Sequence, residues 1–530
     1  MSRTAAAAFV ACLEREGVET IFGLPGEELE DILFAIRDGD VSFVPVRHEQ
    51  AAAFMADVHG RIAGSAGVCL STLGPGATNL MTGVADANLD KAPLVAVTGQ
   101  GGLERLHKES HQALDIVEMF APITKWNTRI SDPDIVHESV RKAFKVAEWE
   151  KPGATHLEFP EDVAASETDV EPLDAGDDVR RPAPDPASIE RVGDLIDEVD
   201  RPLIIAGNGA VRTDASDPLR SLVATTDIPV ASTYMGKGAI SDADQQSLMT
   251  LDSGEDREAS DAIERAELII AVGYDIAEHD PADWNPDDDT PIVHVDTEPA
   301  EVYQHYNPDV EIVGDLGATL RAFDDRCAAA GACGDPEWYR SLREDIIEDV
   351  TRSPDGEDLT LAGTVVHLRK AMANEDVLVS DVGSHKMAIA TRFRTYEPNT
   401  CIISNGLAAM GIAVPGALAA DLAVDANVVA ATGDGGFLMN AAEIETATRL
   451  GCEMTIVVFN DRDYRLVSEH QREHRGEYFG TRFTNPDFVQ FAESFGITAY
   501  RPTNWTDLET GLAEAIDADG MALVDVPLAP

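Results

Sequence analysis

The sequence predicts an α/β protein made of three doubly wound parallel-sheet domains. In each of three blocks, short apolar runs rich in β-branched residues alternate with helical stretches, a pattern typical of parallel sheets. The 530 residues are too many for a single core and fit about three domains. We therefore expect domains at residues 1–165, 187–326 and 360–530, joined by linkers at 166–186 and 327–359.

Each apolar run is expected to form a strand. In the first block, after a helix that ends near Gly17, the runs lie at residues 41–46, 68–72 and 94–98. In the second block they lie at 203–206, 229–231, 268–272 and 292–295. In the third they lie at 377–380, 428–432, 455–459 and 522–526, with a helix expected over 441–450. The first linker is rich in Asp, Glu and Pro, and the second contains a helix.

The charge balance excludes two classes of partner. The chain has 96 acidic and 40 basic residues, a net charge of −56. Such a surface repels nucleic acids and anionic membranes, so neither is expected as a main partner. Because the acidic residues are spread along the chain, we expect a protein that works in concentrated salt, where screening weakens their repulsion.

Cysteine usage and hydropathy indicate an intracellular protein. The six cysteines are scattered, without a Cys-x-x-Cys pair, which indicates reduced and mostly buried thiols. The first residues lead into an amphipathic helix rather than a signal peptide, and no apolar segment approaches the length of a bilayer. We expect a cytoplasmic location.

Two acidic residues, Asp434 and Asp461, each follow a predicted strand. Gly433-Asp434-Gly435-Gly436 follows the run at 428–432, and Asn460-Asp461 follows the run at 455–459. With the helix between them, the runs form a βαβ unit, so both carboxylates reach the carboxyl edge of one sheet. A glycine turn at a helix start attracts phosphate, and carboxylates hold Mg²⁺, which bridges to phosphate oxygens. The pattern predicts a diphosphate held through a metal; the alternative is an ordinary turn between strand and helix.

Glu49 begins a small-residue helix directly after the run at 41–46. Taken alone, it is either a helix-start carboxylate favoured by the macrodipole or a buried acid with a raised pKa that passes a proton to a bound ring nitrogen. The turns Leu24-Pro25-Gly26 and Gly74-Pro75-Gly76 permit close backbone approach to a ligand, or serve only as tight turns.

Other patterns carry less weight. The glycine turn at 207–209 lacks the full Gly-x-Gly-x-x-Gly spacing, which disfavours dinucleotide binding there. The pairs His107/His111 and His470/His474 have i, i+4 spacing without a His-Glu-x-x-His context, which disfavours zinc. The chain also has no Gly-x-Ser-x-Gly elbow, the commonest pattern of serine hydrolases.

Glu49, the Gly-Pro-Gly turn and the Gly-Asp-Gly…Asn-Asp unit occur in this order across nearly the full chain. The combination resembles the thiamine-diphosphate-dependent enzymes of the acetolactate synthase and pyruvate oxidase group. Segments 47–52, 73–79 and 93–100 look like the group's pyrimidine-binding domain. Segments 381–385, 404–411 and 433–440 look like its diphosphate-binding domain, and the middle block looks like its central domain.

Within that group the chain is most similar to catabolic, flavin-independent acetolactate synthases. The segments that carry this similarity are 111–115, 273–285, 392–398 and Asn460-Asp461 with Tyr464. The resemblance implies condensation of two pyruvate molecules to 2-acetolactate and CO₂ through a ylid and an enamine of thiamine diphosphate.

The resemblance also implies a role for each matching residue. Glu49 would hydrogen-bond N1′ of the aminopyrimidine, Met410 would bend the cofactor into a V, and the carbonyl of Ala408 would receive the 4′-amino group. Other cofactor contacts would come from Pro25, Gly26, Asn79, Val382, Gly383, Ser384, His385, Gly433, Asp434, Gly435, Gly436 and Tyr464. Mg²⁺ would be held by Asp434, Asp461 and the backbone carbonyl of Asp463.

Substrate contacts and assembly are implied in the same way. Gln112 would face the reacting carbonyls, with His111 and His470 near the substrate. Biosynthetic members carry a tryptophan at the position of His470 and an arginine-rich flavin segment at residues 274–279; the absence of both implies pyruvate as acceptor and no need for FAD. Glu49 and Met410 would face one cofactor from different subunits of a homodimer or homotetramer.

Three alternatives remain open at this point. The chain could be another thiamine-diphosphate-dependent 2-oxoacid decarboxylase or acetyl-transferring carboligase, or a non-catalytic paralogue that binds the cofactor. It could also be a flavin or nicotinamide oxidoreductase that uses the middle block. The sequence leaves open a regulatory subunit, the choice between dimer and tetramer, and a biosynthetic or catabolic role.

Overall fold

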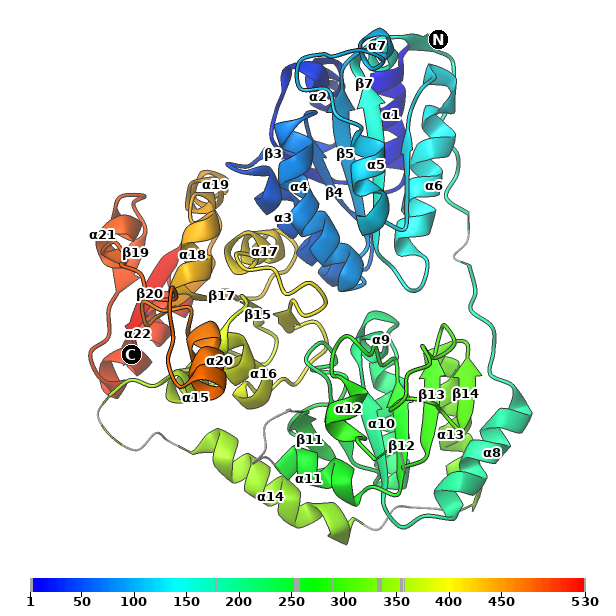
Figure 1. Ribbon diagram of the computed structural model, residues 1–530, viewed down its shortest axis with the longest axis vertical. Coiled ribbons are helices and arrows are strands. Elements are labelled where there is room, and N and C mark those ends of the chain that lie inside the picture. The colour runs from blue at the N-terminus through cyan, green and yellow to red at the C-terminus, as the bar shows by residue number, and fades with distance from the viewer. Residues whose placement is uncertain are drawn as a thin grey trace.

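The chain folds into three parallel sheets. The computed structural model describes residues 3–176, 179–251, 258–287, 290–330, 336–352, 356 and 358–528. Within these residues there are three six-stranded parallel sheets with flanking helices and one short antiparallel ribbon (Figure 1). The ribbon pairs β1 (Arg3–Thr4) with β8 (Glu167–Thr168). The predicted fold class is confirmed.

The first sheet has the strand order β3-β2-β4-β5-β7-β6. Its strands are β2 (Thr20–Gly23), β3 (Ser42–Pro45), β4 (Gly67–Ser71), β5 (Leu94–Gln100), β6 (Trp126–Arg129) and β7 (Ala154–Pro160). Its helices are α1 (Ala5–Arg15), α2 (Glu30–Asp38), α3 (Glu49–Ala63), α4 (Pro75–Leu89), α5 (Ile116–Phe120), α6 (Val136–Glu148) and α7 (Glu161–Ala164). The three predicted runs are β3, β4 and β5, whereas the sequence does not predict β2, β6 and β7.

The second sheet has the order β11-β10-β9-β12-β13-β14. Its strands are β9 (Pro202–Ala206), β10 (Val230–Ser232), β11 (Ser247–Thr250), β12 (Leu268–Val272), β13 (Ile292–Asp296) and β14 (Val310–Val313). Its helices are α8 (Pro186–Asp197), α9 (Asn208–Arg212), α10 (Ser216–Thr226), α11 (Glu258–Arg265), α12 (Pro281–Trp284) and α13 (Leu316–Ala330). The helix predicted in the second linker is α14 (Glu337–Thr351).

The third sheet has the order β16-β15-β17-β18-β20-β19. Its strands are β15 (Val377–Ser380), β16 (Cys401–Ile403), β17 (Val428–Gly433), β18 (Thr455–Asn460), β19 (Thr498–Tyr500) and β20 (Ala522–Pro527). Its helices are α15 (Leu361–Ala371), α16 (Ser384–Arg392), α17 (Ala413–Asp421), α18 (Asp434–Asn440), α19 (Glu443–Leu450), α20 (Arg465–Arg475), α21 (Phe488–Glu493) and α22 (Trp505–Ile516). The helix predicted over 441–450 is α19, but helical structure already begins with α18 at Asp434.

The first and third sheets share one hydrophobic core through α3, α4 and α17, which lie between them (Figure 1). Helix α3 is buried along most of its length. Gly416 of α17 lies so close to α3 that an added Cβ would be 2.8 Å from Cγ2 of Val58. These two domains of one chain therefore form a single packed unit.

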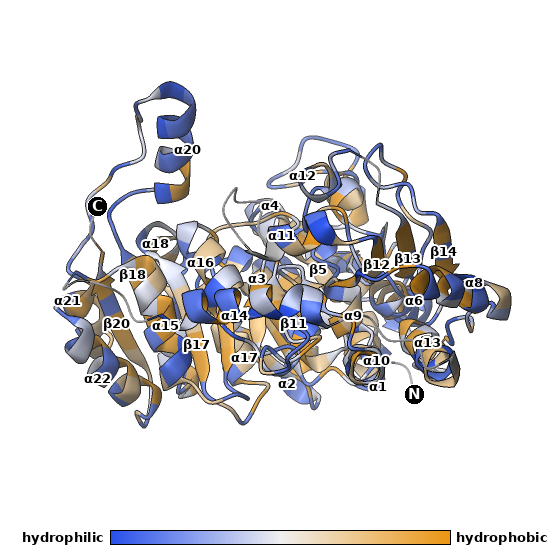
Figure 2. Cartoon of the chain, turned by 90° about the horizontal axis from the view of Figure 1, so that it is seen from below, coloured by the Kyte–Doolittle hydropathy of each residue, from blue (hydrophilic) through white to orange (hydrophobic). Residues whose placement is uncertain are grey.

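Hydropathy follows this architecture. Figure 2 shows that the strands are mostly apolar, that polar residues lie on the outer faces of the helices, and that α20 projects from the third domain. Among the residues described, no helix is long and apolar enough to cross a membrane. The free cysteines Cys12, Cys69, Cys327, Cys401 and Cys452 are buried, and Cys333 lies outside the described residues.

Candidate cofactor and metal site

Asp434 and Asp461 leave the third sheet at the same edge. Strands β17 and β18 are adjacent and parallel, with Gly433 opposite Phe459. Asp434 is the first residue of α18, directly after β17, and Asp461 directly follows β18. The sheet topology thus places both carboxylates beside the N-terminus of α18, where open α/β sheets bind ligands.

Burial raises the pKa of both carboxyl groups, and the charge of Asp434 raises that of Asp461 further. Burial, and then the charge of Asp434, raise the pKa of Asp461 to about 6, although Arg465 lies 3.0 Å away. Burial also raises the pKa of Asp434, whose oxygens accept hydrogen bonds from the N–H groups of Gly435 and Arg462 and from Asn485. A divalent cation between them would relieve this repulsion, as expected of a hard-metal site.

Several buried polar atoms around this pair lack partners. Within the described part of the chain, Oδ1 of Asp463, Oγ of Ser384 and Oδ1 of Asn485 have no hydrogen-bond partner. The described part of the chain contains no group of three or more His, Cys, Asp or Glu side chains that could hold a metal without further ligands. The donor set fits a cation that completes its coordination with a backbone carbonyl and with oxygens of a bound ligand.

Glycines allow neighbouring side chains to pack closely beside the two acids. A Cβ on Gly435 would be 2.5 Å from Cε1 of Tyr464, and one on Gly436 would be 2.9 Å from the carboxyl of Asp381. Gly383 has φ +152°, a conformation that side chains rarely adopt, and it immediately precedes α16. Helices α16 and α18 therefore both begin at glycine-containing turns, and helix N-termini of this kind attract phosphate.

His385 packs against Gly383 and Gly433. It is buried, stacks on Phe459 with the ring centroids 5.5 Å apart, and would contact a Cβ on Gly433 at 3.1 Å. Burial lowers the pKa of His385 to about 3, so the ring is neutral at physiological pH. The neighbouring Val382 donates its N–H to Asp381 at 2.8 Å.

Residues 404–411 form a loop between β16 and α17, which we call the wedge loop. It contains Ala408 and Met410, and Ala408 has φ +54°, in the left-handed region. Gly411, with φ +97°, donates its N–H to Asp381 at 2.8 Å. The loop thus has a defined but unfavourable backbone conformation that must be held from outside.

Glu49 lies at the carboxyl edge of the first sheet. It is the first residue of α3, is only 6% exposed, and accepts a hydrogen bond from Nδ2 of Asn79 at 2.9 Å. A Cβ on Gly76 would be 3.5 Å from its Oε1. The structure therefore brings Glu49, Asn79 and the Gly-Pro-Gly turn together.

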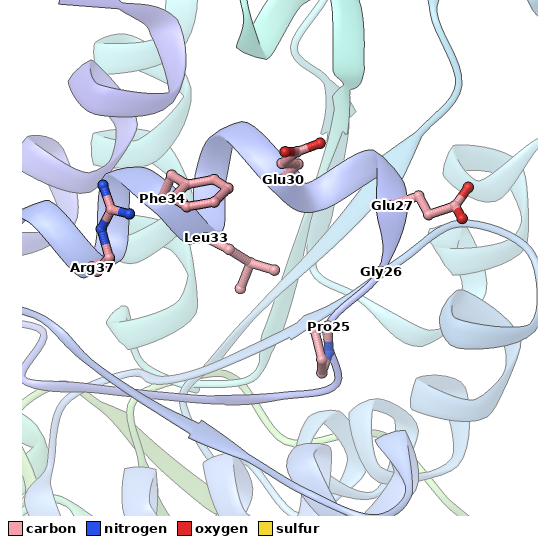
Figure 3. Close-up of a pocket in the computed structure, with 7 residues that line it drawn as sticks. All are labelled: Pro25, Gly26, Glu27, Glu30, Leu33, Phe34 and Arg37. Carbon is pink, nitrogen blue, oxygen red and sulfur yellow. The ribbon is translucent and has the colours of Figure 1, made fainter.

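Pro25 and Gly26 line an open groove of ≈ 520 Å³ beside α2, together with residues further along that helix (Figure 3). Gly26 lies against Thr72, whose Cβ would be 2.4 Å from an added Cβ. Thr72 in turn donates a hydrogen bond to Glu28 at 2.9 Å. Thr72 also lies against Gly76, the glycine beside Glu49, so Pro25 and Gly26 are close to the turn that contacts Glu49.

The predicted substrate residues lie on exposed segments. Gln112 has φ +56° and rests on Gly74, where an added Cβ would be 2.9 Å from Cβ of Gln112; His111 beside it is exposed. His470 lies on α20, exposed and stacked on His474 with centroids 4.1 Å apart. Among the described residues, no hydrogen bond or ion pair joins Glu49 or Gln112 to the wedge loop.

The sequence did not predict the buried charged residues that connect the first domain to the third. Glu443 of α19 is fully buried and accepts the N–H groups of Arg47 and His48 at 3.0 and 3.1 Å. Asp86 of α4 and Asp90, the residue that caps its C-terminus, bind the wedge loop. Their only sequence signal is an i, i+4 spacing of acids at the end of a helix without other charged residues.

Comparison with known families agrees with this geometry. The description "Thiamine pyrophosphate enzyme, N-terminal TPP binding domain" matches residues 3–119. The central domain of the same enzymes matches residues 189–323, and their C-terminal TPP binding domain matches residues 381–526. Each matched segment contains one of the three sheets or most of it.

Curated relatives extend over nearly the full chain. The "Acetolactate synthase" of Bacillus subtilis is 33% identical over 98% of this chain and 92% of its own length. The "Probable acetolactate synthase large subunit" of Methanocaldococcus jannaschii is 34% identical, with 99% and 92% covered. The "Acetolactate synthase, catabolic" of Raoultella terrigena is 32% identical, with 98% and 94% covered. With these three matched domains and this similarity along nearly its whole length, the chain belongs to the acetolactate synthase family of thiamine-pyrophosphate-dependent enzymes.

Proposed function

We propose that this chain condenses two pyruvate molecules to 2-acetolactate and CO₂, with thiamine diphosphate and Mg²⁺ as cofactors. The observation that carries the proposal is the Asp434–Asp461 pair, which lies at the carboxyl edge of the third sheet beside the glycine-rich start of α18. The similarity to acetolactate synthases over at least 98% of the chain supports the choice of reaction.

Asp434, Asp461 and the backbone carbonyl of Asp463 are the proposed Mg²⁺ ligands. The raised pKa of Asp461, about 6, reflects a site that favours a bound cation. Gly435 and Gly436 in the first turn of α18, with Ser384 at the start of α16, would surround the diphosphate, because helix N-termini attract phosphate.

Glu49 is the proposed proton-handling residue. When bound, thiamine diphosphate supplies a carbon nucleophile that also accepts the electrons released by decarboxylation. Glu49 would share a proton with N1′ of the aminopyrimidine. Asn79 fixes the orientation of its carboxylate, and burial excludes competing water.

Met410 and Ala408 would place the aminopyrimidine. The left-handed backbone at Ala408 turns its peptide carbonyl out of the regular helix direction, which suits an acceptor for the 4′-amino group. Met410 would support the cofactor from below as an adaptable apolar side chain. Gln112, His111 and His470 would line the approach of pyruvate, with pyruvate rather than 2-ketobutyrate as acceptor.

FAD is not required in this proposal, because the backbone donors directly after β9 already have partners within the chain. The carboxylate of Glu278 accepts the N–H groups of Asn208 and Met235 at 3.0 and 3.2 Å and binds the hydroxyl of Thr233. Gly209 packs on Gly273, whose Cα would be 2.5 Å from an added Cβ. The N–H groups of Gly207 and Gly209 donate to the carbonyls of Val272 and Gly273 at 2.9 and 2.8 Å.

The active enzyme is proposed to be a homodimer or homotetramer with its sites between subunits. Within one chain, apolar side chains beside the third-domain half-site are exposed: Leu407 by 40%, Leu438 by 41%, Met439 by 47% and Val467 by 50%. Covering them with the first domain of a second copy would bury apolar area and bring Glu49 to Met410.

A product assay tests the proposal. Purified protein is incubated in concentrated KCl with pyruvate, thiamine diphosphate and MgCl₂, and 2-acetolactate is detected as acetoin after acidification. Acetaldehyde as sole product would indicate a decarboxylase instead, and a requirement for an external electron acceptor would indicate an oxidoreductase.

Glu49→Gln separates catalysis from cofactor binding. We expect cofactor affinity to change little, because the diphosphate and metal contacts lie in the third domain, whereas exchange of the C2 proton should slow by at least about 100-fold. Unchanged exchange would refute the role of Glu49, and a wild-type protein that binds the cofactor without turnover would indicate a non-catalytic paralogue.

A further inference from the structure

Two carboxylates of the first domain bind the wedge loop of the third domain in the same chain. Oδ1 of Asp86 accepts the hydroxyl of Ser404 at 3.0 Å and the N–H of Ala409 at 3.2 Å. Asp90 accepts the N–H of Asn405 at 3.2 Å and that of Gly406. These hydrogen bonds engage the loop on both sides of Leu407 and Ala408.

The carboxylates belong to a buried charged cluster between α3, α4 and the loop. Asp86 is fully buried and Asp90 is 1% exposed. Arg61 of α3 binds Asp90 at 2.6 Å and Asp57 at 2.7 Å, and donates to the carbonyl of Ile403 at 3.0 Å. Buried charges persist only when they are paired and hydrogen-bonded, so this cluster has a defined geometry.

A second cation completes the cluster from the third domain. Nζ of Lys386 donates to Oδ1 of Asn405 at 2.8 Å and to the carbonyl of Ser404 at 3.4 Å. Burial is the largest contribution that lowers the pKa of Lys386, while the charges of Asp90 and Asp86 oppose it. The first residues of the loop are therefore held by groups from both domains.

The surroundings of Asp86 favour its protonated form. Burial, and then the charges of Asp90 and Asp57, raise its pKa well above the ordinary value. Its Oδ2 has no hydrogen-bond partner among the described residues. Oδ1 accepts from Ser404 and Ala409, and a carbonyl oxygen of a protonated acid or of an amide can do the same.

The loop needs such support because of its backbone. Ala408 adopts φ +54°, which an L-residue keeps only when its surroundings impose it. The hydrogen bonds to Asp86 and Asp90 hold Ser404, Asn405 and Gly406 before this position and Ala409 after it. The strained residue and Met410 thus depend on groups that are more than 300 residues away in the sequence.

We propose that Asp86 and Asp90 are positioning residues that hold the wedge loop in the conformation required for thiamine diphosphate. The inference rests on the proposed function, because it assigns the loop a cofactor-binding role. Neither residue touches the cofactor in this proposal. They act through the backbone of residues 404–409, and so the first domain prepares the cofactor half-site of its own third domain.

The experiment compares Asp86→Leu with Asp86→Asn and with the control Asp57→Leu in full-length protein. Asn keeps an acceptor and resembles the protonated acid, whereas Leu has no acceptor. Asp57 belongs to the same cluster and pairs with Arg61, but does not bind the loop. Amide hydrogen exchange of the peptide covering 404–411 is measured without cofactor, and the affinity for thiamine diphosphate with MgCl₂ is measured by calorimetry.

In Asp86→Leu we expect loop exchange to rise and cofactor affinity to fall, each by at least about tenfold, the effect of losing one or two buried hydrogen bonds. Asp86→Asn should stay within about threefold of wild type in both. Asp57→Leu should lower the melting temperature but leave loop exchange close to wild type.

Three results would overturn the inference: a protected loop in Asp86→Leu, a mobile loop with unchanged cofactor affinity, or equal loop exchange in Asp86→Leu and Asp57→Leu. If Asp86→Leu does not fold, Ser404→Ala removes one hydrogen bond to Asp86 and should produce a smaller change in the same direction; no change would again overturn it. A wild-type protein that binds no thiamine diphosphate would instead refute the proposed function, whatever the loop exchange.

Discussion

Replacing Asp461 by Asn is predicted to stabilise the metal-free protein while removing its response to Mg²⁺. Burial and the charge of Asp434 raise the pKa of Asp461 from 3.8 to about 6, so ionising this carboxylate in the folded protein costs free energy. The difference corresponds to about 3 kcal/mol, which solvent screening at this partly accessible site reduces to about 1–2 kcal/mol. Asn removes the charge at nearly constant volume, so the variant should gain that amount at neutral pH.

The gain has a defined pH dependence. Because the folded protein binds this proton more tightly than the unfolded chain does, metal-free wild type loses stability relative to Asp461→Asn as the pH rises from about 4 to about 6. Above this range the difference is constant, and below it the difference disappears. Acidic groups far from Asp461 titrate alike in both proteins, so their contributions cancel in the comparison.

Urea unfolding of EDTA-treated protein in constant KCl measures the effect, with and without added MgCl₂ and thiamine diphosphate. Asp519→Asn, at an exposed turn of the same domain, is the control for the change in net charge. Two results would refute the reasoning: a variant less stable than wild type at neutral pH without metal, or one stabilised by the two ligands as strongly as wild type.

Two further predictions concern glycines and salt. Gly436→Ala should destabilise the protein by about 1–3 kcal/mol and weaken cofactor binding, because its Cβ would be 2.9 Å from the buried carboxyl of Asp381. Gly511→Ala lies inside α22, where the nearest atom to the new Cβ is 3.5 Å away, and should stabilise the protein by about 0.5–1 kcal/mol. Equal urea midpoints for the two variants would contradict this. Because the net charge is −56, the thermal midpoint should rise with KCl concentration. It should rise less with sucrose at equal water activity, because only KCl screens charge. Equal rises in the two solutes would show that the charge is not the cause.

Strands with uninterrupted apolar runs could be predicted from the sequence, and those with polar residues or short length could not. β17 and β18 are buried throughout except at their last residues, so their Val and Ile runs stand out. β7 is equally buried but contains His156, which binds Thr98 at 2.8 Å, and Glu158, which binds Gln100 at 2.9 Å. Its polar residues pair across the sheet, and such pairing is invisible in the local sequence.

The start of α18 likewise could not be predicted, because of the glycines in Gly-Asp-Gly-Gly. Two glycines within three residues disfavour a helix by local propensity. Packing of Phe437, which is fully buried against Phe488, overrides that preference. Helical structure therefore begins at Asp434 and not at the predicted residue 441.

Site residues could be predicted where each one directly follows a strand that the sequence reveals. Asp434 and Asp461 each follow a strand, and parallel pairing brings them together. Asp86 and Asp90 could not be assigned in this way, because their partners are the backbone groups of a loop more than 300 residues away. Buried carboxylates that bind backbone leave no motif except a charge where a helix is otherwise apolar.

Asp434 and Asp461 are proposed to hold a cation that binds the diphosphate of the cofactor. Calorimetric titration of EDTA-treated protein with thiamine diphosphate in concentrated KCl, with and without MgCl₂, measures whether they do. We expect saturable binding that requires Mg²⁺ and is lost in Asp434→Asn. Absence of binding in the wild type, or equal binding without Mg²⁺, would contradict it.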